Sequence, residues 1–410
     1  MLKRTTSVII VGVAAAVGVT TMAATDANRT LADPTVAHEW GTFTTVAGQD
    51  GRAIDWLPLG GPVDLPCFVE HFQGNPLNKV LPGELRPVTY ATARSSLRAK
   101  VRMETPVLYF YGPHDMSVNV RVRFPRGILT EWYPHAVVSQ GLVTPATLRD
   151  PKHVGVIEWK KVTIGPSDGR PFPSGYGESH YYAARNTDAV PLSVGAQSER
   201  FLFYRGVADF DVPLAAAALP TGDIRVSNLS SDAIPAVVLF ERRGGKLGYR
   251  LHRDLRGDVT LAPPSLDGSL ATLRADLEQI LIHAGMYPKE ATAMVDTWRD
   301  SWFEDGTRVF YLVPPRTVDM ILPLDIQPGP TSVARAFVGR MEVLTPAIQK
   351  DAEGAIARND TTTLVRYGRF LGPITDRILA AHPDSASRQK IEAVANATFA
   401  AYLARVGTCR

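Results

Sequence analysis

The sequence predicts a β plus α fold, with an N-terminal antiparallel β-sandwich region of one or two units over residues 35–263 and an α-rich C-terminal domain with a few strands over residues 264–410. Up to Pro263, short apolar or alternating runs lie between many glycines and prolines, which is typical of strands. After Pro264, apolar residues recur every three or four positions, which is typical of helices.

The clearest strands are expected between Met103 and Pro134. Residues 107–111 are all apolar or aromatic, as in a strand that is covered on both faces. Residues 118–124 alternate between apolar and polar, which indicates a strand with one face toward water. Because Gly112 to Asp115 supply turn residues between the two runs, we expect them to form a hairpin.

The same patterns recur later in the β region. Further strands are expected at residues 201–204, 223–228 and 236–240. The pair Gly244-Gly245 predicts a hairpin turn into a strand over residues 246–255. Residues 165–177, which are rich in glycine and proline, should form a long surface loop.

The helical part should begin near Leu270 and its first helix should end at Gly285. A second helix is expected from Pro288 to Phe303, with Met294, Trp298 and Trp302 on the side that faces the core.

Strands at residues 307–313 and 318–322 should follow, and residues 333–344 have a mixed pattern. Thr345 before Pro346 predicts the start of a helix, since threonine caps helices and proline suits their first turn. Further helices are expected at residues 373–381 and 385–406.

The N-terminus has the pattern of a secretory signal peptide over residues 1–24. Lys3 and Arg4 precede the uncharged apolar residues 7–19, and small residues follow up to Ala24. An uncleaved membrane anchor is the alternative. We therefore expect export to the periplasm or the extracellular space, with membrane contact only through an uncleaved signal segment.

The formal net charge of +3 predicts no strong attraction to nucleic acid. The two cysteines, Cys67 and Cys409, are separated by most of the chain. A disulfide between them would stabilise the fold by about 4 to 5 kcal/mol. The alternative is a buried Cys67 and a free terminal thiol, and the spacing does not suggest a zinc site.

Three glutamates directly precede tryptophans, namely Glu39, Glu131 and Glu158. A carboxylate beside an aromatic ring is a pairing that sugar-binding sites favour. However, neighbouring residues in a regular strand point to opposite faces, so both members of a pair cannot line one site. The pairs are therefore register markers, and the question is whether their glutamates meet on one face.

Candidate catalytic residues are Glu39, Glu104 and Glu131, since each lies on or beside an expected strand and glycosidases place two carboxyls about 5 to 10 Å apart. Exposed glutamates at strand ends are the alternative. His38, His71 and His135 are weak candidates for metal ligands, because no HExxH or other ligand spacing is present. Structural histidines are the alternative.

The sequence gives little sign of other catalytic patterns. It holds no phosphate-binding loop of the GxxxxGK[ST] type. Ser179 and His180 are neighbours, but the sequence assigns them no orienting acid. The sequence does not identify a cofactor.

Several stretches resemble those of a group of uncharacterised exported bacterial proteins. The resemblance implies export and a shared architecture, and it carries no activity, cofactor or catalytic residue. The stretches are residues 38–44 (HEWGTFT), 55–60 (DWLPLG), 103–111 (METPVLYFY), 298–303 (WRDSWF) and 338–342 (VGRME).

Two functions are consistent with the sequence. The favoured one is a non-catalytic envelope or extracellular protein that binds a glycan or a protein partner, an analogy that rests on the sandwich fold. The alternative is a secreted hydrolase, glycosidase-like or metal-dependent, that uses glutamates of the β region. Two glutamate carboxyls that converge in one cleft would favour the hydrolase.

Overall fold

The computed structural model describes residues 35–61, 64–73, 93, 96–112, 116–166, 169–175, 179–382 and 384–403. The predicted signal peptide, residues 1–24, lies outside the described residues. From Pro34 onward the chain forms one compact unit. Strands contain 38% of the residues and helices 27%. The fold is therefore mixed β/α, which agrees with the predicted combination of β and α structure.

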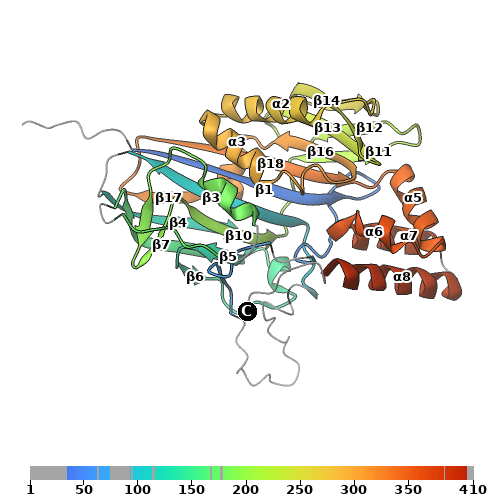
Figure 1. The fold of residues 1–410 in the computed structure, drawn as a ribbon, viewed down its shortest axis with the longest axis horizontal. Helices are drawn as coiled ribbons and strands as arrows, with labels where there is room; N and C mark the ends of the chain where they lie inside the picture. The colour runs from blue at the N-terminus through green and yellow to red at the C-terminus, as the bar shows by residue number, and fades with distance from the viewer. Residues whose placement is uncertain are drawn as a thin grey trace, which may run out of the picture. The chain divides into compact units, whose positions relative to one another are not determined.

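A nine-stranded sheet lies at the centre of the described structure (Figure 1). β1 and β18 pair in parallel, although they are almost 300 residues apart in the chain, and the other neighbouring strands are antiparallel. In spatial order the strands are β14 (Lys246–Leu255), β13 (Ile234–Arg243), β16 (Gly306–Leu312), β18 (Ser332–Val343), β1 (Val36–Ala47), β3 (Val101–Tyr111), β10 (Leu202–Ala208), β5 (Gly127–Tyr133) and β2 (Glu70–His71).

Two smaller sheets accompany it in the described residues. The first contains β17 (Leu324–Gln327), β4 (Met116–Pro125), β7 (Val154–Ile164), β8 (Leu192–Val194), β9 (Gln197–Glu199) and β6 (Val137–Ser139). The second contains β11 (Leu214–Ala218), β12 (Ile224–Asn228) and β15 (Asp258–Leu261).

One face of the large sheet shares a buried cluster with these smaller sheets, although the large sheet is neither wholly antiparallel nor confined to residues 35–263 as the predicted sandwich is. Phe43 on β1 belongs to the same buried cluster as Val120 on β4 and Val226 on β12. Trp40 and Val46, whose side chains point to the other face of β1, belong to two separate clusters under the helices. The large sheet is therefore covered on both faces.

Helices cover that second face in two groups, and Figure 1 shows α5 to α8 gathered at one end of the sheet. Thr345 caps α5 as predicted, since its hydroxyl accepts a hydrogen bond from Ile348 N. The helices of the described residues, of which η1 and α4 instead contribute to the cluster on the first face, are η1 (Thr147–Arg149), η2 (His180–Arg185), α2 (Leu270–His283), α3 (Pro288–Thr297), α4 (Pro315–Ile321), α5 (Pro346–Ala357), α6 (Thr361–Val365), η3 (Gly368–Phe370), α7 (Leu371–Ala381) and α8 (Ser385–Leu403).

The aromatic stripe of the second predicted helix is buried, as expected, and Trp298 and Trp302 are at most 1% exposed. The helix is shorter than predicted, because α3 ends at Thr297. The carbonyl oxygens of Trp302 and Glu304 instead accept hydrogen bonds from the guanidinium of Arg308.

The predicted division at residues 263 and 264 does not separate the sheet from the helices. β16 and β18 come after it and lie inside the large sheet, where β18 pairs with β1. A separate α-rich C-terminal domain is therefore not supported. Residues 333–344 belong to a long strand that their mixed pattern did not indicate. Arg340 and Glu342 are buried in ion pairs on this strand, whereas the usual alternation of apolar and polar residues places charged side chains on the exposed face.

Two local predictions are wrong. β3 and β4 do not form a hairpin, because β3 pairs with β1 and β10 whereas β4 pairs with β7 and β17. Residues 318–322 lie mostly in α4 rather than in a strand, because short apolar runs do not distinguish the two and Pro315 starts a helix well. The Gly244-Gly245 hairpin is confirmed by pairing of β13 with β14.

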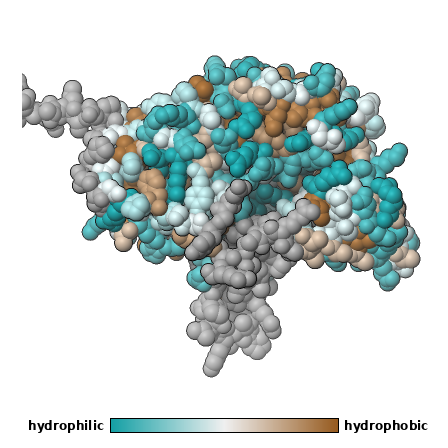
Figure 2. All heavy atoms as spheres, viewed as in Figure 1, coloured by the Kyte–Doolittle hydropathy of each residue, from teal (hydrophilic) through white to brown (hydrophobic). Residues whose placement is uncertain are grey.

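The surface of this unit is mixed in character. Figure 2 shows hydrophilic residues over most of the visible face, with hydrophobic residues in separate patches. None of the described helices combines the length and the apolar character needed to cross a membrane.

Gly339 provides a test of the packing around β18. A side chain there would collide with the ring of Tyr311, which pairs with Gly339 across β16 and β18. We expect Gly339→Ala to lower the free energy of unfolding by about 1 to 3 kcal/mol, measured by urea denaturation. Gly257→Ala, at an exposed site with nothing within 4 Å, is the control and should change little. Equal effects of the two changes would contradict this packing.

Candidate functional site

A row of charged side chains crosses the helix-covered face of the large sheet. On β1, Trp40 packs under α2 and α3, and Val46 packs under α5 to α8. Thr42 and Thr44 lie between them along the strand. The charged residues lie beside this middle part of β1 on the neighbouring strands, and they are at most 8% exposed. They are Arg308 on β16, Arg340 and Glu342 on β18, Arg102 and Glu104 on β3, Arg205 on β10 and Glu131 on β5.

Glu104 occupies the middle of this row. Its Oε1 lies 3.0 Å from Arg102 Nε and also accepts from Arg369 Nη1, while Oε2 accepts from Thr44 Oγ1 at 3.1 Å. Burial alone would raise the pKa of Glu104, but the charges of Arg369, Arg102 and Arg340 bring it below its ordinary value. Glu104 is therefore an ionised anchor for arginines that come from the sheet and from η3.

Arg205 and Asp64 form a second anchor next to it. Arg205 Nη1 and Nη2 lie 2.7 and 3.1 Å from the two Asp64 oxygens, and Nη2 also donates to Thr105 Oγ1 at 3.2 Å. Desolvation raises the pKa of Asp64, but Arg205 and then Arg102 and Arg369 lower it well below its ordinary value. Asp64 is thus also an ionised carboxylate.

Irregular backbone surrounds these two anchors. The register shifts between β1 and β3, between β3 and β10, and between β10 and β5, all close to Glu104 and Arg205. Thr105 has a φ of 47°, a left-handed conformation that is uncommon for threonine. Bulges re-aim side chains next to functional sites, and strained residues cluster there.

A cavity of about 190 Å³ opens beside the row. Its volume corresponds to roughly six water molecules, so it suits a small ligand or one end of a larger one. Its charged and polar lining includes Asp64, Arg102, His180, Glu304, Arg369 and Tyr402. We call this cavity the charged pocket.

Glu304 differs from the other carboxylates at this site. Arg340 Nη2 donates to its Oε1 at 2.8 Å, yet burial raises its pKa more than Arg340, Arg308 and Arg369 lower it. Its Oε2 and the Tyr402 hydroxyl both lie close to Gly368. A Cβ atom added to Gly368 would be 3.7 Å from Glu304 Oε2 and 3.1 Å from the Tyr402 hydroxyl. Glu304 is therefore a carboxyl group that retains its proton to a higher pH than usual and faces the charged pocket.

His180 has the orienting acid that the sequence could not supply. Its Nε2 lies 2.8 Å from Asp300 Oδ2, and both residues line the charged pocket. The hydroxyl of Ser301, the next lining residue, is buried and has no hydrogen-bond partner within the described residues. Ser179 Oγ donates to the carbonyl of Asp64, which ties η2 to the pocket wall.

The three glutamates predicted to be catalytic do not lie on one face of the sheet. Glu104 and Glu131 belong to the charged row, where Glu131 lies opposite Arg205 in the register of β5 and β10. Glu39 is on the other face of the sheet, where it accepts from Tyr204 OH at 2.5 Å and Arg335 Nε at 2.7 Å. None of the three lines the charged pocket, although Glu104 holds two arginines that do.

In the third glutamate–tryptophan pair, Glu158 and Trp159, the glutamate lies at the surface. Glu158 on β7 accepts a hydrogen bond from Arg121 on β4 at 2.6 Å, and the side chain of Arg121 is 52% exposed. Trp40, Trp132 and Trp159 are all buried. Because the large sheet is covered on both faces, Glu39 is buried as well, and its charge is matched by Arg335.

The histidines proposed as weak metal ligands do not form one site. His38 is buried and lies 2.7 Å from Glu290 at the start of α3, whereas His135 is exposed and lies 2.9 Å from Glu70. His71 is on β2, opposite Glu131. Among the described residues no group of three or more histidine, cysteine, aspartate or glutamate side chains is arranged to hold a metal.

Cys67 is disulfide-bonded. Cys409 lies outside the described residues, so its pairing with Cys67 stays a prediction.

The stretches that carry the resemblance come together at this site. Thr44, Gly60, Glu104, Ser301 and Arg340 each belong to a different one of them, and each lies in the row or the charged pocket. Comparison with models of known families and with curated proteins gives no match.

Glu104 and Glu158 provide a matched test of the anchor. Glu104→Gln leaves Arg102 and Arg369 without their shared counter-charge, so it should lower the free energy of unfolding by about 3 to 5 kcal/mol. Glu158→Gln removes only a surface pair and should cost at most about 1 kcal/mol. Denaturant unfolding at pH 7 measures both.

The pH dependence gives the control for this test. Since the pKa of Glu104 is lowered in the folded state, its ionised form stabilises the fold above the ordinary value of 4.5, and this contribution is lost as pH falls. The difference in free energy of unfolding between the native protein and Glu104→Gln should therefore become smaller in acid. If Glu104→Gln lowers the free energy of unfolding at pH 7 no more than Glu158→Gln does, Glu104 is not an anchor.

Proposed function

We propose that this protein is a hydrolase that removes a small acidic group, such as a terminal uronic acid residue, from a glycan held in the charged pocket. The observation that carries the proposal is that Glu304 and His180 line the same cavity. Burial raises the pKa of Glu304, and His180 Nε2 lies 2.8 Å from Asp300 Oδ2. A carboxyl that retains its proton in one cavity with an oriented imidazole is typical of acid–base sites.

Glu304 is the proton donor to the leaving group in this scheme. Its Oε1 accepts a hydrogen bond from Arg340, so the proton resides on Oε2, the oxygen that lies against Gly368 and near Tyr402. Burial keeps this proton in place at a pH where an exposed glutamate has lost it.

His180 is the base that takes a proton from the attacking water. Its Nε2 faces Asp300, and in this scheme Nε2–H donates a hydrogen bond to Asp300 Oδ2 while Nδ1 keeps its lone pair. An imidazole oriented by a carboxylate is a common general base. Both residues lie at the pocket, where water has access, since the side chain of His180 is 25% exposed.

Arg102 and Arg369 bind the acidic group of the substrate. Glu104 occupies one nitrogen of each guanidinium, and Pro58 O occupies a second nitrogen of Arg102 at 2.7 Å. A guanidinium has five N–H donors, so both arginines retain donors for a carboxylate. The size of the pocket limits the bound part to about one sugar ring, which favours cleavage at a chain end.

Non-catalytic binding of the same acidic sugar is the second candidate. It is favoured by the ionised anchors, which hold Arg102 and Arg369 in place before any ligand arrives. Binding alone, however, has no use for a carboxyl that retains its proton.

The test is hydrolysis of 4-nitrophenyl glycosides of uronic acids, with the neutral glycosides as comparison. Glu304→Gln should lower kcat by about 10²- to 10⁴-fold with a small change in KM, because the acid is lost and the arginines remain. The rate of the native protein should fall on the alkaline side, with a midpoint above the ordinary glutamate value of 4.5.

Glu392→Gln on the exposed side of α8 is the matched control and should leave kcat unchanged. Saturable binding of glucuronate with no turnover of any substrate would contradict the hydrolase and support the non-catalytic binding protein. If glucuronate does not bind, both candidates are wrong.

A further inference from the structure

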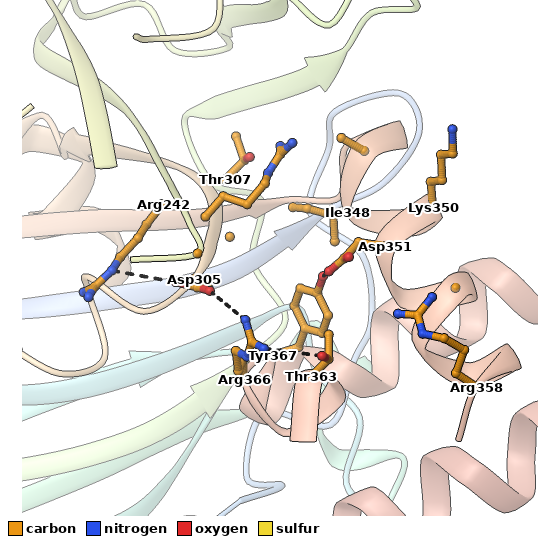
Figure 3. A pocket seen from close by; sticks show the side chains of 15 residues that line it. Arg242, Asp305, Thr307, Ile348, Lys350, Asp351, Arg358, Thr363, Arg366 and Tyr367 are labelled. Carbon is orange, nitrogen blue, oxygen red and sulfur yellow. Dashed lines mark hydrogen bonds and ion pairs between the residues drawn. The ribbon is translucent and has the colours of Figure 1, made fainter. Parts of the chain in front are cut away.

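A second, larger cavity lies at the end of the sheet that α5 and α6 cover, and we call it the basic groove. Its volume is about 680 Å³, within the range of sites for drug-sized ligands. It shares no lining residue with the charged pocket. Figure 3 shows Arg242, Asp305 and Arg366 on one side and Lys350 and Arg358 on the other.

The basic groove has an excess of positive charge. Five basic residues line it, namely Arg242, Arg243, Lys350, Arg358 and Arg366, against two acidic ones, Asp305 and Asp351. The lining residues therefore carry an excess of three positive charges.

The acidic residues of the groove already have partners. Asp351 accepts from Tyr367 OH at 2.7 Å. Asp305 lies between Arg242 and Arg366, at 3.7 and 3.8 Å.

The two cations of α5 are less constrained. Lys350 and Arg358 form no ion pair within 4.0 Å with any carboxylate in the described part of the chain. Gly354 leaves room for the guanidinium of Arg358, since a Cβ there would lie 3.2 Å from Arg358 Nη1. Donors from one helix are therefore available to a negatively charged ligand.

Thr307 supplies an independent observation. It lines the basic groove and is only 2% exposed, yet its hydroxyl has no hydrogen-bond partner within the described residues. Arg242 Nε is also buried without a hydrogen bond. Buried polar groups in folded proteins are nearly always paired, so these two atoms are unsatisfied donors or acceptors in the wall of the groove.

We propose that the basic groove binds a small molecule with several oxyanion groups, held by Lys350, Arg358 and Arg242 and by the hydroxyl of Thr307. The chemistry is shared by an acidic oligosaccharide and by a polyphosphate. This binding is independent of the proposed hydrolysis, since the two cavities have no residue in common.

Calorimetric titration of the full chain with tetragalacturonate and with tripolyphosphate tests the proposal, and neutral maltotetraose is the control ligand. At least one anion should bind, with an affinity that falls as salt is added. The anion that binds more tightly shows whether the groove prefers the carboxylates of an acidic oligosaccharide or the phosphates of a polyphosphate. Absence of binding by both anions would overturn the proposal.

Variants locate the binding. The double change Lys350→Gln with Arg358→Gln should weaken it by about tenfold or more, because two charge-assisted contacts are lost. Arg256→Gln removes an equally exposed charge from the turn after β14 and should leave the affinity unchanged. Equal weakening by both would show general attraction to the surface and overturn the site.

Thr307→Val separates binding from stability. The change replaces a hydroxyl that has no partner with a methyl group, so the melting temperature should stay the same or rise. The affinity for the anion should fall several-fold. Unchanged affinity would remove Thr307 from the site. Glu304→Gln should leave this binding intact, which keeps the outcome distinct from that of the hydrolase test.

Discussion

The structure depends on the neutralisation of charges inside a sheet that is covered on both faces. Glu104 lies in the middle of that sheet and joins Arg102, from its own strand, to Arg369, from the helical part. Without this contact two buried guanidinium groups would lose the carboxylate that pairs with both, at a cost of several kcal/mol. The same contact aligns both arginines along the charged pocket, so the interaction that joins helices to sheet also builds the candidate site.

Local structure was predictable where the pattern depends on neighbouring residues. The cap at Thr345, the Gly244-Gly245 turn and the buried stripe at Trp298 follow from local chemistry and were confirmed. The place of β18 beside β1 was not predictable, since pairing between distant strands leaves no local signal. Its charged residues, Arg340 and Glu342, also disturb the apolar pattern, because their partners come from other elements.

The candidate site was predicted only in part. Glu104 was singled out, but its role is to hold arginines rather than to face a ligand. Glu304 was missed because it lies after the predicted helix, in a segment with no pattern of its own. The pairing of His180 with Asp300 spans 120 residues and had no signal in the sequence.

The proposed chemistry requires that Glu304 retains its proton in a pocket where the pKa of Asp64 is lowered. Infrared difference spectroscopy measures this directly, as the carbonyl stretch of a protonated carboxyl that is absent in Glu304→Gln. We predict that this band titrates at a pH above the ordinary glutamate value of 4.5. A band that titrates at or below that value, as for an exposed glutamate, would contradict the proposed role of Glu304.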